Sequence, residues 1–291
     1  MATFQLLTDS AVDLPFSVLR EHNVDFVSMH IHVNGQDIPD DLGEQFDLDD
    51  FYQTLKNGTM PSTAQVNIGQ FVAFFEPYVK RNIPILYVGF SSGLSGTFNN
   101  ARLARNLLRK EYPKAKIYLV DTLAASGGEG LILLDAIDKR DNGMGCAELT
   151  DWLVTHRLRY RQWFTVNDLN FLYHGGRVSR SSATIGSLLQ IKPIMDVDQH
   201  GNLRVISKAR SRRRSLIELA NHTVKTLANP DNPRILITAS QAEKAANEVA
   251  DHIRRQVPNA NILIEKLGPT IASHTGLGCV AVFSMGKENR Q

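Results

Sequence analysis

The chain has 291 residues, of which 43% are hydrophobic and 21% are charged. This is the composition of a folded globular protein, and it excludes wholesale disorder. The 32 basic and 30 acidic side chains leave a formal net charge of +2, which argues against a general binder of nucleic acid or of anionic membranes.

Short apolar runs alternate with amphipathic segments in the first half of the chain. We expect strands at residues 4–7, 24–33, 83–90 and 116–121, and helices that begin near Asp13, Asp47, Asn67, Thr97 and Gly130. Strands that alternate with helices are typical of a parallel α/β sheet. At roughly 150 residues per domain the length predicts about two domains. The sequence therefore predicts an N-terminal α/β domain over residues 1–160.

The pattern changes in the second half of the chain. We expect a strand at 162–167, a hairpin of 191–197 and 203–207, helices at 211–227 and 242–256, and strands at 234–239, 261–267 and 279–284. A hairpin followed by mixed helices and strands is typical of an α+β arrangement. The sequence therefore predicts a C-terminal α+β domain over residues 161–291, with a mixed or antiparallel sheet.

The cysteine content and the N-terminus bear on the cellular compartment. Cys146 and Cys279 are far apart and form no CxxC pair, which excludes a disulfide scaffold or a cysteine-rich zinc fold and suits a reducing compartment. The first seven residues do not resemble a signal peptide, and no apolar run reaches the ~20 residues of a membrane span. We expect a cytoplasmic protein without stable membrane insertion.

The strongest local feature is the segment GFSSGLSGT at residues 89–97. It follows a buried strand, at the sheet edge where open α/β folds bind their ligands. Glycines let backbone N–H groups converge and hydroxyls add donors, so the segment predicts an anion site for a carboxylate or phosphate. The alternative is an ordinary polar loop in which a hydroxyl caps the next helix.

The same segment matches the GxSxG pattern of serine esterases. In that interpretation Ser91 is a nucleophile, served by a later Asp and His. The pattern requires a helix directly after the serine, whereas the helical periodicity begins only near Thr97. No HGGG-like oxyanion segment is present either, so the hydrolase is the alternative function.

Three other segments carry candidate ligand groups. Thr63 lies in a second hydroxyl-rich loop that otherwise reads as a linker. Arg177 follows two glycines, where it either binds an anion bidentately or lies solvated on a turn, with a helix expected after it. His274 lies in a glycine-rich segment, where it is either a polar residue whose hydrogen bonds are satisfied near a turn, or a donor to a carboxylate.

Two further patterns are weak. His30 and His32 share one face of a strand, but no third ligand at suitable spacing accompanies them, so we expect no metal. The basic cluster ARSRRR at 209–214 lacks interleaved aromatic residues, so it indicates a solvated face or a docking patch for an acidic partner rather than a nucleic-acid site. The sequence contains no GxxxxGK[ST] and no strand-linked GxGxxG, so no nucleotide site is visible.

Six segments occur together in an order that resembles the DegV family of bacterial fatty-acid-binding proteins along the whole chain. They are Thr8-Asp9-Ser10-Ala11, Pro61-Ser62-Thr63-Ala64-Gln65, Ser91-Ser92-Gly93-Leu94-Ser95-Gly96-Thr97, Gly175-Gly176-Arg177-Val178-Ser179, Ile191-Lys192-Pro193-Ile194 and Gly268-Pro269-Thr270-Ile271-Ala272-Ser273-His274. The chain departs from the family pattern at Ala64 and Val66, and at Ala272 and Leu277.

The resemblance implies a two-domain protein that binds one long-chain fatty acid with its carboxylate between the domains. It implies no catalytic residue, cofactor or metal, and a possible partner in an ATP-binding fatty-acid kinase subunit that makes an acyl phosphate. The implied ligand residues are Thr63, Ser91, Ser92 (the first choice), Gly93, Ser95, Arg177 and His274. We expect the tail in an apolar tunnel of the N-terminal domain, among helices that carry Phe71, Phe74, Phe75 and Leu94.

Overall fold

The computed structural model describes residues 4–167, 169–178 and 191–291, and their strands form three sheets. The first sheet is parallel, in the order β2-β1-β6-β7. Its strands are β1 (Gln5–Asp9), β2 (Val24–Val27), β6 (Ile85–Gly89) and β7 (Ile117–Asp121). All five residues of β6 are buried, as expected of a near-continuous apolar run in a sheet covered on both faces. The predicted parallel α/β sheet is confirmed.

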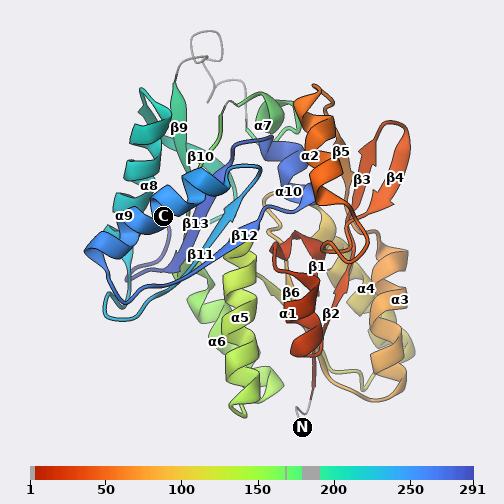
Figure 1. Cartoon of the computed structure of the whole chain (residues 1–291). Coiled ribbons are helices and arrows are strands. Elements are labelled where there is room, and N and C mark those ends of the chain that lie inside the picture. The colour runs from red at the N-terminus through yellow and green to blue at the C-terminus, as the bar shows by residue number, and fades with distance from the viewer. Residues whose placement is uncertain (1–3, 168, 179–190) are drawn as a thin grey trace.

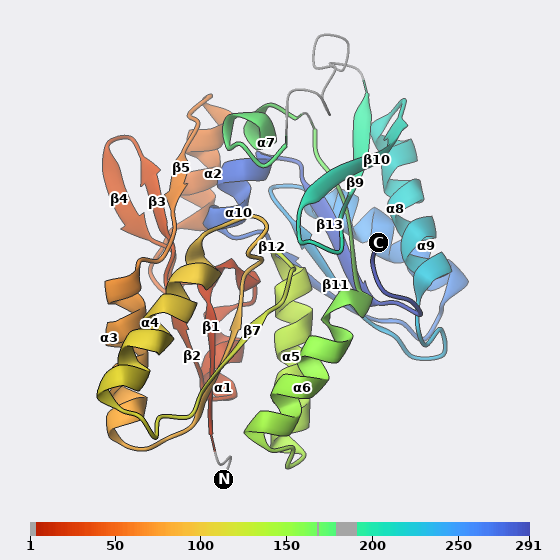
Figure 2. The same cartoon turned by 180° about the vertical axis from the view of Figure 1, so that it is seen from behind.

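Helices cover both faces of the parallel sheet (Figures 1 and 2). The helices of the first half are η1 (Ser10–Val12), α1 (Phe16–Glu21), α2 (Leu48–Lys56), α3 (Ile68–Lys80), α4 (Thr97–Glu111), α5 (Gly127–Asp141) and α6 (Cys146–His156). Alternation along the strands divides the apolar side chains between two cores. Leu7 and Tyr87 pack in the core that contains α3 and α4, whereas Leu6 and Val88 pack in the core that contains α5 and α6.

The second sheet has six strands in the order β10-β9-β8-β13-β11-β12. They are β8 (Tyr160–Thr165), β9 (Lys192–Val197), β10 (Leu203–Ala209), β11 (Arg234–Ala239), β12 (Asn261–Lys266) and β13 (Val280–Met285). The pair β11 and β12 is parallel and the other pairs are antiparallel, so the predicted mixed sheet and hairpin are confirmed. The remaining helices are η2 (Arg157–Arg159), α7 (Asn170–His174), α8 (Arg212–Thr226), α9 (Glu243–Gln256) and α10 (Pro269–Thr275).

A small third sheet differs from the sequence expectation. The single strand predicted at 24–33 is wrong, because the chain leaves the parallel sheet after β2 and enters a new sheet as β3 (His30–Val33). Met29 marks the break: its N–H donates to Ser10 Oγ and its carbonyl accepts from the N–H of Asp40. β3 pairs with β4 (Gln36–Pro39) and β5 (Ser62–Ala64). The Asn-Gly turn at 34–35 was the sequence signal for the unpredicted hairpin.

The change from one large sheet to the other falls between β7 and β8, close to residue 160. Helix α5 contacts strands of both sheets, and one apolar core contains both Leu6 of β1 and Phe283 of β13. The expected helix after Arg177 and the end of that motif, Ser179, fall outside the described residues. The division into domains 1–160 and 161–291 stays a prediction.

The tip of the β9–β10 hairpin rests on the hydroxyl-rich loop that follows β6. Ser91 Oγ donates to the carbonyl of Gly201 at 2.9 Å. Gly201 has a φ of +79°, and a Cβ there would lie 2.1 Å from Ser91 Oγ. A Cβ on Gly93 would lie 2.6 Å from the carbonyl oxygen of His200. Glycine on both sides therefore allows the two backbones to touch.

We expect Gly201→Ala to destabilise the fold more than Gly143→Ala. Both positions have positive φ, which costs about 1 kcal/mol or more for an alanine, but the space around Gly143 is open. Alanine at 201 adds a clash with Ser91. Urea unfolding of both variants measures the difference, and equal free energies of unfolding would contradict this contact.

Candidate functional site

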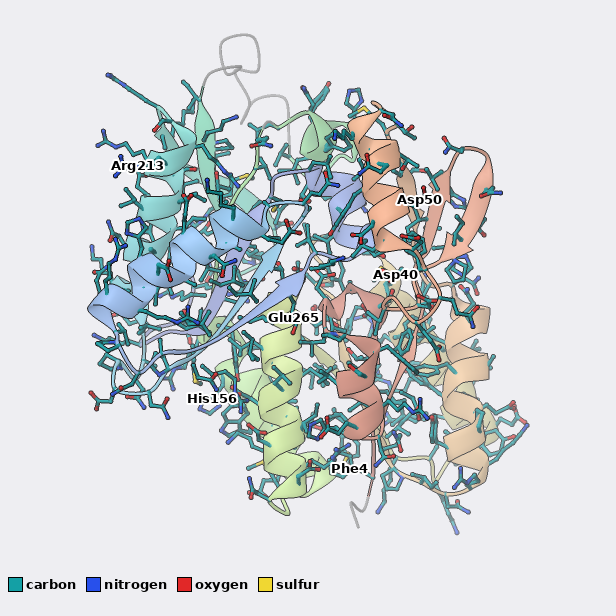
Figure 3. All side chains as sticks on the ribbon, in the orientation of Figure 1. Phe4, Asp40, Asp50, His156, Arg213 and Glu265 are labelled. Atoms are coloured by element: carbon teal, nitrogen blue, oxygen red, sulfur yellow. The ribbon has the colours of Figure 1, made fainter. Side chains whose placement is uncertain are left out.

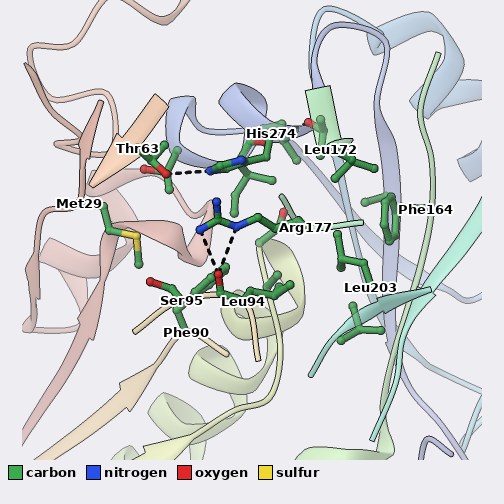
Figure 4. Close-up of a pocket in the computed structure, with 18 of the residues that line it drawn as sticks. Met29, Thr63, Phe90, Leu94, Ser95, Phe164, Leu172, Arg177, Leu203 and His274 are labelled. Carbon is green, nitrogen blue, oxygen red and sulfur yellow. Dashed lines mark hydrogen bonds between the residues drawn. The ribbon is translucent and has the colours of Figure 1, made fainter. Parts of the chain in front are cut away.

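A cavity of about 570 Å³ lies where the three sheets meet. Its wall comes from β5, the loop after β6, the start of α5, strands β8, β9, β10 and β13, and helix α10. Most of the wall is apolar, and its aromatic members are Phe90, Phe164 and Phe283. Polar side chains collect at one side, where the close-up shows Thr63, Ser95, Arg177 and His274 around a common space (Figure 4).

His274 and Thr63 form the hydrogen bond that joins α10 to β5. His274 Nε2 lies 2.7 Å from Thr63 Oγ1. Burial, together with the positive charge of the nearby Arg177, lowers the pKa of His274 to about 4, so the imidazole is neutral at neutral pH. Its Nδ1 is buried and has no hydrogen-bond partner among the described residues. A Cβ on Gly175 would lie 2.2 Å from this nitrogen, so glycine at 175 makes room for the ring.

Arg177 is a half-buried cation whose hydrogen bonds go to carbonyl oxygens. Its Nε and Nη2 donate to the carbonyl of Leu94 at 3.2 and 3.1 Å, and its Nη1 donates to the carbonyl of Gly175. Among the described residues no carboxylate forms an ion pair with it. Burial lowers the pKa of Arg177. A guanidinium in this setting has donors and charge to offer an anion in the cavity.

Ser95 supplies a hydroxyl from the loop after β6. Its Oγ accepts from the N–H of Thr97 at 3.2 Å and lies 3.0 Å from Thr97 Oγ1, so it caps the start of α4. When the Thr97 hydroxyl donates to it, the hydrogen of Ser95 is free for a ligand. Gln65 lies beside this turn, because a Cβ on Gly96 would lie 2.2 Å from Gln65 Oε1.

The other predicted loop residues lie outside the cavity wall. Ser91 is fully buried with its hydroxyl donated to Gly201. Ser92 is exposed, and its N–H donates to Asp121 Oδ1 at 3.2 Å. Gly93 packs against the hairpin tip. The structure thus brings Thr63, Ser95, Arg177 and His274 together, and the loop turns Ser91, Ser92 and Gly93 away from them.

The apolar wall of the cavity lies in a different part of the molecule from the tunnel that we expected. Phe71 and Phe75 are fully buried in the core between α3 and the parallel sheet, and neither lines the cavity, nor does Phe74. Leu94 does line it. The apolar wall opposite comes mainly from the second sheet, from residues such as Phe164 and Leu203. The expected tunnel among the helices of the first half is therefore wrong for this cavity.

Helix α10, which carries His274, is fixed by side chains from the first half of the chain. Asp13 Oδ1 accepts from the N–H of Gly268 at 2.9 Å. Asp40 accepts from the hydroxyl of Thr270, and the hydroxyl of Tyr52 donates to the carbonyl just before Gly268. Figure 3 labels Asp40 near the middle of the molecule. Burial raises the pKa of Asp13 well above its ordinary range and that of Asp40 to about 6.

Sequence reasoning missed α10 and several polar residues of the cavity wall. The helix was hidden in a glycine-rich segment, yet Pro269 at its first position and Gly276 just after it are ordinary start and stop signals. Gln65, Ser126 and Gln162 also line the cavity. Gln65 lies in the segment 61–65 that carries Thr63, whereas nothing in the local sequence marks Ser126 and Gln162, because these two reach the cavity only when distant elements pack together.

The esterase alternative is not supported. Helix α4 begins at Thr97, not directly after Ser91. The hydroxyl of Ser91 is buried and donated to a backbone carbonyl, so it has no hydrogen bond to a histidine that could serve as its base. A nucleophile requires that base within hydrogen-bond reach.

The histidine pair and the basic cluster singled out in the sequence make contacts within the fold. His30 and His32 both contact Asp37 Oδ1, at 3.1 and 3.3 Å. The described residues hold no group of three or more His, Cys, Asp or Glu that could bind a metal. In the basic cluster, Arg212 donates to the carbonyl of Gly278. Arg213 is exposed on α8, at the opposite side of the molecule from α2 (Figure 3).

No helix among the described residues is long and apolar enough to cross a membrane.

We expect His274→Gln to flatten the dependence of stability on pH. The folded pKa is about 4 against an ordinary value of 6.5, so the unfolded chain takes up the proton first as pH falls. The lipid-free wild type therefore loses stability from about pH 6.5 to about 4, by on the order of 3 kcal/mol from this group.

Urea unfolding across this pH range measures the effect as the difference between wild type and variant. The buried carboxyl of Asp40 acts with the opposite sign, because its raised pKa removes stability as pH rises toward about 6, but it is present in both proteins and cancels. Parallel curves for the two proteins would contradict a buried neutral His274.

Known proteins resemble this chain over nearly its whole length. A family model described as "Uncharacterised protein, DegV family" matches residues 3–287. A DegV domain-containing protein of Clostridium perfringens is 39% identical over 286 residues, which cover 98% of both chains.

Solved structures share the fold. The structure described as fatty acid binding of a DegV family protein from Thermus thermophilus is 26% identical, with a TM-score of 0.87 over 98% of this chain and 99% of that chain. The Streptococcus pneumoniae Fatty Acid Kinase B3 protein, loaded with linoleic acid, is 23% identical, with a TM-score of 0.85 over 97% of this chain and 99% of that chain. The family model and the Clostridium relative both extend across the chain, so this protein belongs to the DegV family.

Proposed function

We propose that this protein binds one long-chain fatty acid, with its carboxylate among Thr63, Ser95, Arg177 and His274 and its tail along the apolar wall. The observation that carries the proposal is Arg177, a half-buried cation at a largely apolar cavity, whose hydrogen-bond partners within residues 4–167, 169–178 and 191–291 are carbonyl oxygens. A buried charge is stable only when it is paired. A ligand with an anionic head can pair with this cation, and its long apolar body can cover the apolar wall.

The energetics of such a ligand suit the two sides of the cavity. Each buried CH₂ group contributes about 0.8 kcal/mol, so a long tail supplies most of the affinity before ordering costs are subtracted. The head must find hydrogen-bond donors when it leaves water. His274 and Thr63 use one donor on their mutual hydrogen bond, so a neutral imidazole leaves this pair one further donor for the head. The Ser95 hydroxyl and the Arg177 guanidinium supply the other donors, with a single positive charge. The volume of about 570 Å³ lies in the usual range for small-molecule sites.

The relatives support this ligand class. The description of the Thermus thermophilus structure names fatty acid binding, and at 26% identity its fold covers this chain almost completely. The family motifs that carry Thr63, Ser95, Arg177 and His274 meet at the cavity. The site residues themselves stay proposals, to be tested by substitution.

We further propose a carrier role without catalysis, in which a separate ATP-binding kinase subunit phosphorylates the bound carboxylate to an acyl phosphate. Support comes from the name of the Streptococcus pneumoniae relative, a fatty acid kinase B3 protein, and from the absence of a nucleotide-binding loop in the sequence. Arg177 would then orient the carboxylate and stabilise the charge of the incoming phosphate. The two free cysteines suit a cytoplasmic location.

The purified protein should contain a bound fatty acid. Organic extraction followed by mass spectrometry should find close to one fatty acid per chain, because the apolar wall is poorly solvated when empty. The variant Arg177→Met keeps the length of the side chain and removes its charge, so it should retain less lipid. Repeated extraction of wild-type protein without any lipid would count against the proposed function.

Ser95→Ala should weaken fatty-acid binding and Ser92→Ala should not. Ser95 faces the cavity, and loss of a hydrogen bond to a charged head costs about 1–3 kcal/mol. Ser92 is three residues earlier, is exposed and lies outside the wall, so it is the matched control. Titration with a fluorescent fatty acid measures both variants, and thermal unfolding checks that the start of α4 survives in Ser95→Ala. Weaker binding by Ser92→Ala alone would move the head to the other side of the loop.

A further inference from the structure

Gln162 is a buried amide in the apolar part of the cavity. It lies on β8, is 1% exposed and lines the cavity wall. Successive residues of a strand alternate between faces, so Gln162 shares its face with Phe164. Figure 4 shows Phe164 and Leu203 on the other side of Arg177 from Thr63. Gln162 therefore belongs to the tail side of the cavity and not to the cluster proposed for the carboxylate.

Only one end of this amide has a hydrogen bond. Gln162 Oε1 accepts from the backbone N–H of Ala125 at 3.0 Å, and this contact fixes the orientation, since a flipped amide would bring two donors together. Gln162 Nε2 is buried and has no hydrogen-bond partner in the part of the chain that the structure describes. The amide is also held in place by α5, because a Cβ on Gly128 would lie 2.5 Å from Oε1. The amide therefore cannot rotate to bring Nε2 to a new partner without breaking the hydrogen bond that Oε1 accepts from Ala125.

The neighbouring polar groups do not satisfy this donor. The hydroxyl of Ser126, which also lines the cavity, donates to Asp13 Oδ2 and lies 3.1 Å from Thr238 Oγ1. Helix α5 starts at Gly127, and the positive end of its dipole adds to the preference for an acceptor at this place. A buried donor left without a partner is rare in folded proteins and calls for a ligand or a water.

We propose that Gln162 Nε2 donates to an oxygen atom on the tail of the ligand, so that the protein selects oxygenated fatty acids, with a hydroxyl or keto group along the chain, over plain ones. The inference rests on the proposed function and specifies its substrate class. A plain hydrocarbon leaves the amide donor unsatisfied, whereas an oxygen at the matching position pairs with it. A buried polar group discriminates strongly against analogues that cannot complete its hydrogen bond.

The test compares lipid-free wild-type protein with stearic acid and with stearic acids that carry one keto or hydroxyl group at successive positions along the tail. At the matching position we expect the oxygenated acid to bind at least about fivefold tighter than stearic acid. In Gln162→Met, which keeps the length and removes the donor, this preference should disappear. Phe164→Leu is the control, since it changes the wall beside Gln162 without touching the donor, and it should keep the preference.

A second measurement does not depend on any variant. The infrared stretch of the keto group should move to lower frequency when the matching acid is bound to wild-type protein, as it does when a carbonyl accepts a hydrogen bond. Equal affinities along the whole series, or an unshifted carbonyl in the tightest complex, would overturn the inference and assign the donor to a water molecule. Failure of every acid to bind, stearic acid included, would instead overturn the proposed function.

Discussion

The geometry of the cavity depends on how α10 is attached to the first half of the chain. Asp13 and Asp40 are buried carboxyls that accept from the backbone and hydroxyl of the segment that begins this helix. They hold His274 opposite Thr63 across 211 residues of sequence. Burial raises the pKa of both carboxyls, so their ionised forms lower the stability of the fold as pH rises. The polar side of the cavity is thus built by contacts outside it.

The cavity differs from an ordinary core because one of its sides is apolar and the other is polar and charged. The wall from the second sheet is apolar, while Arg177 brings a charge whose partners are two carbonyl groups. Both halves contribute to the polar side, since Thr63 and Ser95 come from the first half and Arg177 and His274 from the second. An amphipathic acid fits this division, and the free amide of Gln162 adds a polar point within the apolar side.

Periodicity was sufficient to predict both large sheets, since runs such as β6 are apolar along their whole length. The family resemblance selected Thr63, Arg177 and His274, which the structure brings together at the cavity, and their role as anion ligands stays a prediction. The resemblance could not distinguish Ser92 from Ser95, because both lie in one polar loop and only its turn, with the N–H of Ser95 donating to the carbonyl of Ser91, decides which hydroxyl faces the cavity. The aromatic residues of α3 likewise fit a core or a tunnel equally well by pattern.

The wall of the cavity runs from Met29 to Phe283, and the last strand, β13, lies in the middle of its sheet between β8 and β11. During synthesis the cavity therefore cannot close until β13 has been made. A chain that stops before β13 would expose the apolar lining to water, and an apolar ligand added at that stage would not be enclosed. Occupancy by ligand thus reports that the chain has been made as far as β13 and has folded.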